Sequence, residues 1–330
     1  MKKIKKNKKL IVEKKKDRVK ISIVFGNIPK LNIGEVLIKS SYSSINFKDL
    51  LVLNGNPGLV KHFPHTPGID VSGTIILSKS KKFKIGQKVV VIARPMGINN
   101  AGGFQEYVKV KENWVNILPK GMSLKKSMVI GTAGFTAMFT ALKIKRNNAK
   151  KKPILITGAS GGVGMISIII LKSWGYKIVA CIRNRIFYDQ IKKIGADEVI
   201  NHKDLINNPN LPLLKEKYSA IIDNIGGNAL QSAYRQVEKK GSVYLIGNAS
   251  GEITKLYLLP FILRGIKLIG INAEMLEETD RRKIFINLVN LSKNSKLNYI
   301  YEQKKLNFLL NKILINKKKK NIRRIIIKIK

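Results

Sequence analysis

The order of apolar and polar positions changes character once along the chain. In the first third, short β-branched runs alternate with turns rich in Gly, Pro, Asn and Asp, which is typical of a compact, barrel-like β domain. Strands are predicted at residues 19–24, 35–39, 71–77, 88–92 and 106–110. The lysine-rich residues 1–8 are predicted to be a solvated extension.

From residue 153 onward, short apolar runs alternate with segments of helical length. This βα alternation predicts a parallel, doubly wound sheet. A helix broken near Gly131 and Gly134 is expected before it, over about residues 124–144. Strands are predicted at 153–157, 177–182, 198–200, 218–223, 241–246 and 325–329, and helices at 163–174, 185–194, 228–238, 278–291 and 306–314.

The densest cluster of glycines follows the first strand of this second region. The sequence Pro153-Ile-Leu-Ile-Thr-Gly-Ala-Ser-Gly-Gly-Val-Gly164 predicts a strand, a tight turn and the start of a helix. Gly158, Gly161 and Gly164 permit a sharp turn, close approach of backbone N–H groups to a pyrophosphate, and tight helix packing. The helix N-terminus adds donors and a positive dipole end, so the motif predicts a dinucleotide site.

The end of the next strand bears on which dinucleotide binds. A site for NAD commonly has an acid there for the ribose 2′-hydroxyl, whereas a basic residue accommodates the 2′-phosphate of NADP. Here Arg183 and Arg185 follow Cys181, and no acid occurs before Asp189. We therefore predict an NADP(H) site.

The formal net charge of +43 allows two interpretations. One is a basic surface that binds nucleic acid. The other is compositional drift towards Lys, Ile and Asn, as an AT-rich coding sequence would produce. The lysines are spread over all segments, and aromatic residues are not interleaved with them for stacking on bases. We favour drift, so nucleic acid is not an expected partner.

Length and composition restrict the class of protein further. A chain of 330 residues, 44% of them apolar, is long enough for two domains with separate cores. No apolar run reaches the ~18 residues of a membrane span, and no secretory signal precedes the first strand, so a cytoplasmic location without membrane contact is expected. The single cysteine, Cys181, excludes an internal disulfide and a multi-cysteine zinc site.

Several separate segments resemble the zinc-free medium-chain dehydrogenases/reductases, in particular the quinone-oxidoreductase-like proteins of the acrylyl-CoA reductase group. The resemblance covers roughly residues 10–330 and has high collective specificity. It rests on Ser44-Ile-Asn-Phe-Lys-Asp49, Phe63-Pro-His-Thr-Pro-Gly-Ile-Asp-Val-Ser-Gly73, Gly102-Gly-Phe-Gln-Glu-Tyr107, Ile130-Gly-Thr-Ala-Gly-Phe-Thr-Ala-Met138, Gly158–Gly164, Ile194-Gly-Ala-Asp197, Asp223-Asn-Ile-Gly-Gly227 and Leu259–Gly270.

The resemblance implies a two-domain α/β fold. A GroES-like substrate domain (residues 1–128, with 276–330 returning to it) would accompany a Rossmann NADP-binding domain (129–275), with the ligand cleft between them and a homodimer as the assembly. The zinc enzymes of the superfamily use Cys and His ligands that this chain lacks, and His62, His65 and His202 have no ligand-type partners nearby in the sequence. No metal site is predicted.

The resemblance also assigns cofactor residues, several with altered side chains. Phe47 stands where the family has Tyr, and Ile182, Arg183 and Asn184 stand where it has Ser-Gly-Arg at the 2′-phosphate, so Arg183 or Arg185 must supply the charge. The complete set implied is Asn46, Phe47, Thr132, Ser160, Gly161, Gly162, Val163, Ile182, Arg183, Asn184, His202, Asn248, Ile262, Ala273 and Asn316.

Simpler structural roles remain open for some polar residues. Asn46 could cap a helix at residues 47–53, and Asp49 fits a carboxylate in the first turn of that helix. Asp70 between Gly68 and Gly73 fits a residue that ties a turn. Asp223 lies at a strand end where ligands meet an α/β sheet, and it could equally anchor its loop.

The activity implied is NADPH-dependent reduction of an α,β-unsaturated acyl-CoA, with acrylyl-CoA giving propanoyl-CoA. Backbone N–H groups or the Asn46 amide could stabilise the thioester oxygen, and the proton could come from solvent. No catalytic side chain is identified. The alternatives are quinone or alkenal reduction, an NADPH-binding protein with a basic nucleic-acid-binding surface, and a remnant under relaxed selection.

Overall fold

The chain forms two compact units. The computed structural model describes residues 6–16, 18–56, 58–147, 152–206, 210–310 and 324–329. Unit 1 comprises Met1–Thr132 and Tyr301–Lys330, and unit 2 comprises Ala133–Ile300. These limits differ from the expected boundaries at residues 128 and 275. Helix α8 (Glu278–Ser292) belongs to unit 2, where the ring of Phe285 lies 5.6 Å from that of Phe135.

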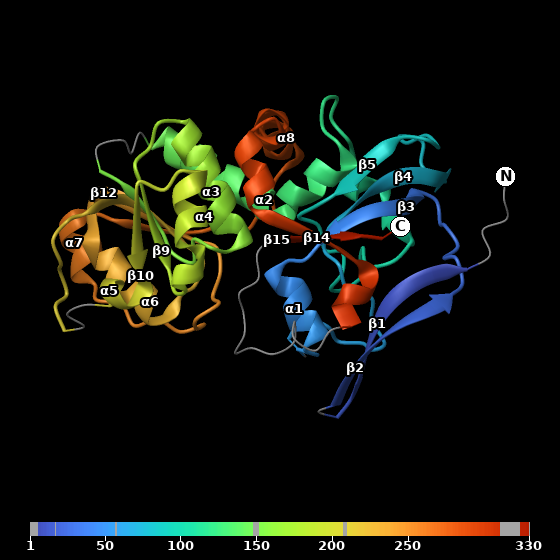
Figure 1. Ribbon diagram of the computed structural model, residues 1–330, viewed down its shortest axis with the longest axis horizontal. Helices are drawn as coiled ribbons and strands as arrows, with labels where there is room; N and C mark the ends of the chain where they lie inside the picture. Colours follow the sequence, from blue (N-terminus) through green and yellow to red (C-terminus); the bar gives the residue numbers. More distant parts are fainter. Residues whose placement is uncertain are drawn as a thin grey trace. The chain divides into compact units, whose positions relative to one another are not determined.

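Unit 1 is built on a seven-stranded, mostly antiparallel sheet. Its strand order is β14-β15-β3-β4-β5-β7, and β6 also pairs with β3, while β1 and β2 form a separate hairpin (Figure 1). The strands are β1 (Asn7–Lys15), β2 (Arg18–Gly26), β3 (Glu35–Ser44), β4 (Val71–Ser78), β5 (Lys88–Val91), β6 (Tyr107–Lys111), β7 (Asn116–Ile117), β14 (Tyr301–Lys305) and β15 (Arg324–Lys328). The short helices are α1 (Phe47–Leu53), η1 (Glu112–Trp114) and η5 (Leu306–Leu310).

The first strand begins earlier than the sequence pattern predicts. Asn7 and Lys8, expected in a solvated extension, lie in β1. The Asn7 side chain is 2% exposed, because its Nδ2 donates to Gln105 Oε1 at 2.9 Å and its Oδ1 accepts from the Tyr107 N–H at 3.0 Å. Two contacts with residues about 100 positions away thus fix the start of the strand.

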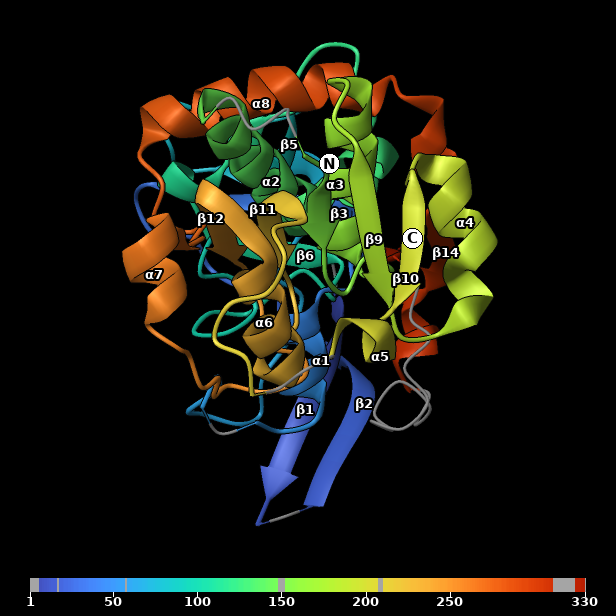
Figure 2. The same cartoon turned by 90° about the vertical axis from the view of Figure 1, so that its left-hand side faces the viewer.

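Unit 2 is a six-stranded parallel sheet with the order β10-β9-β8-β11-β12-β13, which is the doubly wound order of a Rossmann fold (Figure 2). The strands are β8 (Ile154–Ile156), β9 (Ile178–Ile182), β10 (Glu198–Asn201), β11 (Tyr218–Asp223), β12 (Val237–Leu245) and β13 (Lys267–Gly270). The other helices are α3 (Gly162–Ser173), η2 (Arg185–Phe187), α4 (Tyr188–Ile194), α5 (His202–Leu205), α6 (Gly227–Ala233), η3 (Tyr234–Gln236), α7 (Leu259–Arg264) and η4 (Ser295–Tyr299).

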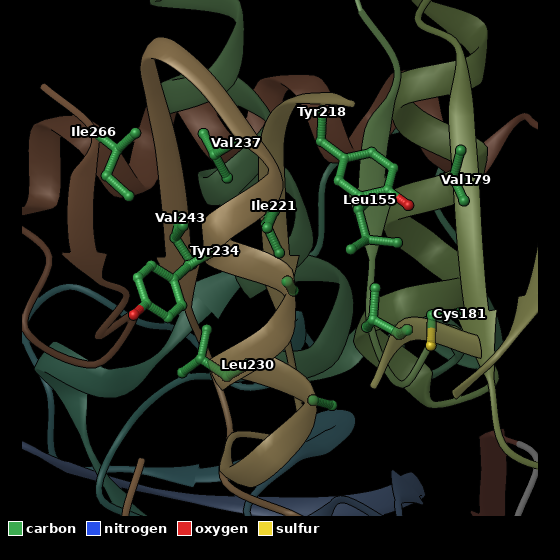
Figure 3. Packing of buried hydrophobic residues seen from close by; sticks show 13 residues of the cluster. Leu155, Val179, Cys181, Tyr218, Ile221, Leu230, Tyr234, Val237, Val243 and Ile266 are labelled. Carbon is green, nitrogen blue, oxygen red and sulfur yellow. The ribbon is translucent and has the colours of Figure 1, made fainter. Parts of the chain in front are cut away.

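The central strands of unit 2 are buried on both faces, which is why β8, β9 and β11 are almost continuously apolar in sequence. On one face, Leu155, Val179 and Ile221 pack with side chains of α6 and η3, including Leu230 and Tyr234 (Figure 3). The lone cysteine, Cys181, belongs to this cluster, and burial raises the pKa of its thiol to about 12. This core holds the carboxyl ends of the strands in fixed positions.

Helix α2 (Leu124–Arg146) crosses the limit between the two units in the chain. It contains a single non-helical residue, Gly131, with φ 51° and ψ −159°, so one of the two expected breaks is present. Although no membrane-length run was expected, α2 is the one helix among the described residues long and apolar enough to span a bilayer. However, 78% of its most apolar stretch is buried, as in the core helix of a globular fold.

Candidate functional site

The glycine-rich turn between β8 and α3 has the geometry of a phosphate-binding loop. Gly158 has φ +57°, which makes the sharp turn possible. A Cβ on Gly164 would lie 2.7 Å from the Cα of Ala159, so this glycine lets the helix pack against the loop. A Cβ on Gly161 would meet only the Gly158 carbonyl oxygen, at 3.2 Å. The three glycines therefore divide the roles of turning, packing and leaving space for a ligand.

The predicted contacts Ser160, Gly161, Gly162 and Val163 follow one another from the end of this loop into the first turn of α3, and all four are partly exposed. Gly161 is the N-cap of α3, and the first N–H groups of a helix have no intrahelical acceptor. They also lie at the positive end of the helix dipole. The loop thus fits a diphosphate, as expected from its sequence.

Polar side chains at the end of β11 fasten the loop to the sheet. The buried Asp223 accepts from Thr157 Oγ1 at 2.7 Å and from the Gly226 N–H at 2.8 Å, and burial raises its pKa. Asn224 Nδ2 donates to the Thr157 carbonyl oxygen at 2.8 Å. Asn224 Oδ1 is buried without a hydrogen-bond partner among the described residues, so it can accept from a ligand or water there.

The predicted ribose-phosphate residues meet at the neighbouring strand ends. Asn201 of β10 is in register with Ile182 of β9, which brings Arg183, Asn184 and His202 into one region. Ile182 is buried, whereas Arg183 and Asn184 are exposed beyond the strand. His202 Nδ1 is buried and has no hydrogen-bond partner in the described part of the chain. An exposed cation beside an imidazole fits the 2′-phosphate and adenine end of NADP.

Three further expected contacts of unit 2 follow β12. Asn248 is exposed in the loop after this strand, and Ile262 of α7 is 70% exposed. Ala273 is buried after β13, and its carbonyl oxygen accepts from Arg281 Nη1 at 3.3 Å. The expected contact Asn316 lies outside the described residues. The structure therefore gathers the loop and ribose residues, and it places Asn248 against the loop after β11, where a Cβ on Gly226 would lie 3.5 Å from the Asn248 Cα.

In unit 1, Asn46 is the N-cap of α1, and Phe47, which is 40% exposed, is its first residue. Asp49 lies in the first turn, as expected, and accepts from the N–H groups of Asn46 (2.8 Å), Gly68 (3.0 Å) and Ile69 (2.9 Å). Burial raises the pKa of Asp49 to about 7, although these donors favour its ionised form.

The side chain of Asn46 is engaged inside unit 1. Its Nδ2 donates to Asp70 Oδ2 at 2.8 Å and to the Ser44 carbonyl oxygen at 3.3 Å, while its Oδ1 accepts from Arg324 Nη1 at 2.9 Å. Both amide hydrogens have acceptors within the unit. This arrangement argues against the suggested use of the Asn46 amide to stabilise a thioester oxygen.

Asp70 is the centre of this buried network, a larger role than the turn-tying residue suggested by the sequence. Its carboxylate accepts from Ser44 Oγ (2.5 Å), Thr132 Oγ1 (2.5 Å) and the Thr132 N–H (3.0 Å). The guanidinium of Arg324 lies 3.6 Å away and compensates the charge. Sequence reasoning missed Arg324, whose only signal is a cation beside an isoleucine-rich run that forms a buried strand.

The donor sets do not fit a metal ion. Within the residues that the structure describes, no three His, Cys, Asp or Glu side chains gather as a metal site. The two buried carboxylates nearest each other, those of Asp49 and Asp70, are surrounded by N–H and O–H donors instead.

Comparison with known proteins agrees with this geometry. The family model "Alcohol dehydrogenase GroES-like domain" matches residues 32–120, and "Zinc-binding dehydrogenase" matches residues 162–290. The putative quinone oxidoreductase YhfP of Bacillus subtilis is 36% identical over 266 residues, which are 80% of this chain and 81% of that protein. The chain belongs to the medium-chain dehydrogenase/reductase superfamily. Within this superfamily, the chain belongs to the quinone-oxidoreductase group. The family resemblance seen in the sequence and the expected two-domain fold are thus confirmed.

Other members of the superfamily are similar over most of their length. The acrylyl-CoA reductase AcuI of Ruegeria pomeroyi is 33% identical over 251 residues, 76% of each protein. The YhdH oxidoreductase of Salmonella enterica, solved in complex with NADP, has a TM-score of 0.90 and 29% identity, over 98% of this chain and 100% of that one. YhfP, solved with NAD bound, has the same TM-score and coverage and 33% identity.

Proposed function

We propose that this chain uses NADPH to reduce the double bond of an α,β-unsaturated acyl-CoA, with acrylyl-CoA as its first candidate substrate. The likeness to AcuI supports the substrate class, and the likeness to a YhdH structure that contains NADP supports the cofactor. The observation that carries the proposal is the phosphate loop of α3, placed one strand away from the exposed Arg183. Such a pairing of loop and cation selects a phosphorylated dinucleotide.

The bound nicotinamide would supply a hydride for the β-carbon of the substrate. The chain's own residues would bind and orient the cofactor. The N-terminus of α3 would hold the diphosphate, and Arg183 would hold the 2′-phosphate. The proton for the α-carbon would come from solvent.

A quinone or alkenal is the second candidate acceptor. It is favoured by the 36% identity to YhfP, a putative quinone oxidoreductase. Both candidates need the same hydride donor, so the distinction between them lies in the acceptor alone.

Oxidation of NADPH by the purified protein, followed at 340 nm, tests the proposal directly. Acrylyl-CoA, crotonyl-CoA and a soluble quinone are compared as acceptors, at equal protein concentration. We expect the highest kcat/KM with acrylyl-CoA. Faster turnover with the quinone would replace the first candidate by the second, and no turnover with any acceptor would exclude both.

We also propose that the protein is a homodimer joined along the β13 edge of unit 2. This is the outermost strand of its sheet and is followed by α8. The segment between β12 and α8, residues 246–277, has three basic and three acidic residues in a chain of net charge +43. Eight of its large apolar side chains are exposed: Ile253, Leu256, Leu258, Leu259, Ile262, Leu263, Leu268 and Met275.

A segment of balanced charge with many exposed apolar side chains, on an otherwise strongly cationic molecule, is where two copies can approach with the least repulsion. Leu258→Lys with Met275→Lys should therefore shift sedimentation equilibrium from dimer to monomer. Ile33→Lys, at a 93% exposed apolar site in unit 1, is the control. A wild-type monomer, or a dimer unaffected by the double substitution, would exclude this interface.

A further inference from the structure

A cavity of about 500 Å³ lies in unit 1, where the start of β1 meets the ends of β14 and β15. This volume is within the usual range of ligand pockets. Every described residue that lines the cavity belongs to unit 1, so it lies in a different unit from the phosphate loop of α3. None of the described residues assigned to the cofactor lines it.

The apolar part of the lining is held in place by the core of unit 1. Leu306 and Ile329 are 2% and 6% exposed, and both pack in the cluster that includes Leu10 and Phe104. The Ile329 N–H also donates to the Ser41 carbonyl oxygen at 3.1 Å, which fixes the end of β15 against β3. This part of the cavity can therefore receive an apolar group without rearrangement.

The charged part of the lining is mostly cationic. It consists of Lys8 of β1, Lys305 of β14, Lys328 of β15 and a single acid, Glu106, so three lysines against one glutamate leave a formal charge of +2. The Glu106 N–H donates to the Lys8 carbonyl oxygen at 2.9 Å, which places the acid next to β1. The excess of positive charge is therefore at the ends of β14 and β15.

Lys305 and Lys328 are directly opposite each other in the sheet. Strands β14 and β15 are parallel, and the two lysines are in register. Both are exposed, and neither side chain has an ion pair or a hydrogen bond with another described residue. The adjacent Lys304 differs, because it lies 3.2 Å from the Glu302 carboxylate. Like charges opposite each other on neighbouring strands are unfavourable, so the Lys305–Lys328 pair lacks the anion that would stabilise it.

A phosphate monoester matches this lining in charge and in size. It carries about −1.5 to −2 charges at pH 7 and offers three acceptor oxygens, so it can meet three ammonium groups and balance the formal charge. Lysine binds phosphate as a flexible point charge and does not need a planar partner. A carboxylate has only one negative charge, and inorganic phosphate would leave Leu306 and Ile329 uncovered.

We propose that this cavity binds a phosphate monoester whose adjoining part is apolar or aromatic. Lys305 and Lys328 are its principal ligands, and Lys8 is the third. The occupant removes the repulsion between the two opposed lysines. The site is independent of the proposed reaction, so it would remain if the chain reduced none of the acceptors tested above.

Isothermal titration calorimetry of the full chain with phenyl phosphate, inorganic phosphate and benzoate tests the site. Phenyl phosphate should bind most tightly, because it alone combines the phosphate charge with an apolar ring. Lys305→Gln with Lys328→Gln should weaken it at least about tenfold, through loss of charge-assisted contacts. No binding of phenyl phosphate, or binding no tighter than that of the other two probes, would overturn the proposal.

The control for net charge is Lys81→Gln with Lys84→Gln. These exposed lysines lie between β4 and β5, beside the other end of β3, where Lys79 and Glu35 share a backbone hydrogen bond. This pair of substitutions should change the Kd of phenyl phosphate by no more than about twofold, because distant exposed charges are screened. Equal weakening by the two pairs would show attraction to the overall charge and not a site.

Thermal unfolding at low ionic strength gives a second readout. Without ligand, the Lys305→Gln, Lys328→Gln protein should have a Tm at least as high as that of the wild type, because the opposed charges are gone. It should also lose the rise in Tm that phenyl phosphate gives the wild type. A lower Tm without ligand would make the two lysines structural residues, and that result would contradict the proposal.

CoA and 3′-dephospho-CoA distinguish two sources of the phosphate. If it is the 3′-phosphate of a CoA substrate, the Lys305→Gln, Lys328→Gln protein should bind CoA more weakly and 3′-dephospho-CoA as the wild type does. If phenyl phosphate alone is weakened, the phosphate belongs to a separate molecule. Both results support a phosphate site, and only the first also depends on the proposed function.

Discussion

At the scale of residues, the candidate site depends on buried acids. Asp49, Asp70 and Asp223 are each 0% exposed, and each accepts hydrogen bonds from loop N–H groups or hydroxyls. The carboxylate of Asp70, which Arg324 compensates, organises its loop more strictly than a neutral acceptor would, because charge-assisted hydrogen bonds are shorter and stronger. The cation Arg183, by contrast, is exposed and available to a ligand.

Arg183→Ala should weaken NADPH binding by roughly 10- to 150-fold, because it removes a charge-assisted contact to the 2′-phosphate worth ~1.5–3 kcal/mol. The Kd for NADH should stay nearly unchanged, because NADH lacks the 2′-phosphate. Fluorescence titration with both nucleotides measures the two constants, and Arg282→Ala, at an exposed arginine of α8, is the control for net charge. Equal wild-type affinities for NADPH and NADH would contradict the NADP site.

The raised pKa of Asp49 predicts a pH dependence of stability. The native carboxyl keeps its proton up to about pH 7, whereas the unfolded one loses it near pH 4. Between about pH 4 and pH 7 the native state binds more protons than the unfolded state does. The free energy of unfolding is therefore greatest below about pH 4, and it falls as the pH rises towards 7, by up to about 1.4 kcal/mol per pH unit.

Denaturant unfolding at pH 5, 6, 7 and 8 can follow this change in unit 1 through Trp114, in a Trp174→Phe background that removes the tryptophan of unit 2. Asp49→Asn should be less stable overall but should lack the fall of the free energy of unfolding with pH. Parallel curves for the two proteins would rule out Asp49 as the titrating group.

At the scale of elements, local sequence patterns placed most helices and strands, and contacts between distant residues decided the rest. Helix α1 occupies 47–53, as expected, because Asn46 is its N-cap and Asp49, three residues later, completes a capping box. The start of β1 at Asn7 depends on Gln105 and Tyr107. Likewise, the importance of Arg324 depends on carbonyl groups about 195 residues earlier, which no local pattern contains.

The backbone conformation of Gly161 in the phosphate loop decides what a larger side chain at this position would do. Gly161 has φ −79° and ψ 168°, which valine can adopt, and the positive φ of this loop occurs at Gly158. Gly161→Val should lower the free energy of unfolding by about 1 kcal/mol at most, which corresponds to about 2–4 °C in Tm. It should nevertheless abolish NADPH binding, because its methyl groups would cover the N-terminus of α3.

Gly161→Ala should be intermediate in NADPH affinity, which separates loss of space from loss of fold. Circular dichroism establishes the fold, and energy transfer from protein to bound NADPH reports binding. A folded Gly161→Val protein that retains this signal would place the diphosphate elsewhere.

At the scale of the whole molecule, the excess of 63 basic over 20 acidic residues is a property of solvated positions. The lysine side chains in ion pairs are 35% exposed or more, whereas the acids at the candidate site are fully buried. These lysines thus lie where solvent surrounds them, which is consistent with compositional drift.

Drift makes a specific prediction about salt. RNA binding should be weak and independent of sequence, and it should disappear near physiological ionic strength, because scattered lysines only exchange counterions. The KM for acrylyl-CoA should rise only modestly with salt, since most of its contacts would be uncharged. Filter binding and initial rates from 25 to 300 mM salt test both statements. A tight, salt-resistant and sequence-selective RNA complex would favour the nucleic-acid alternative.

The position of Arg324 in the chain has a consequence for biosynthesis. Unit 2 is continuous, so a ribosome delivers all of its strands before residue 300 is complete. Unit 1 is discontinuous, and Asp70 must wait some 250 residues of translation for the cation that compensates its charge. A nascent chain should therefore contain a complete unit 2 and an incomplete unit 1 for several seconds. Unit 1 should accordingly depend more on chaperones than unit 2 does.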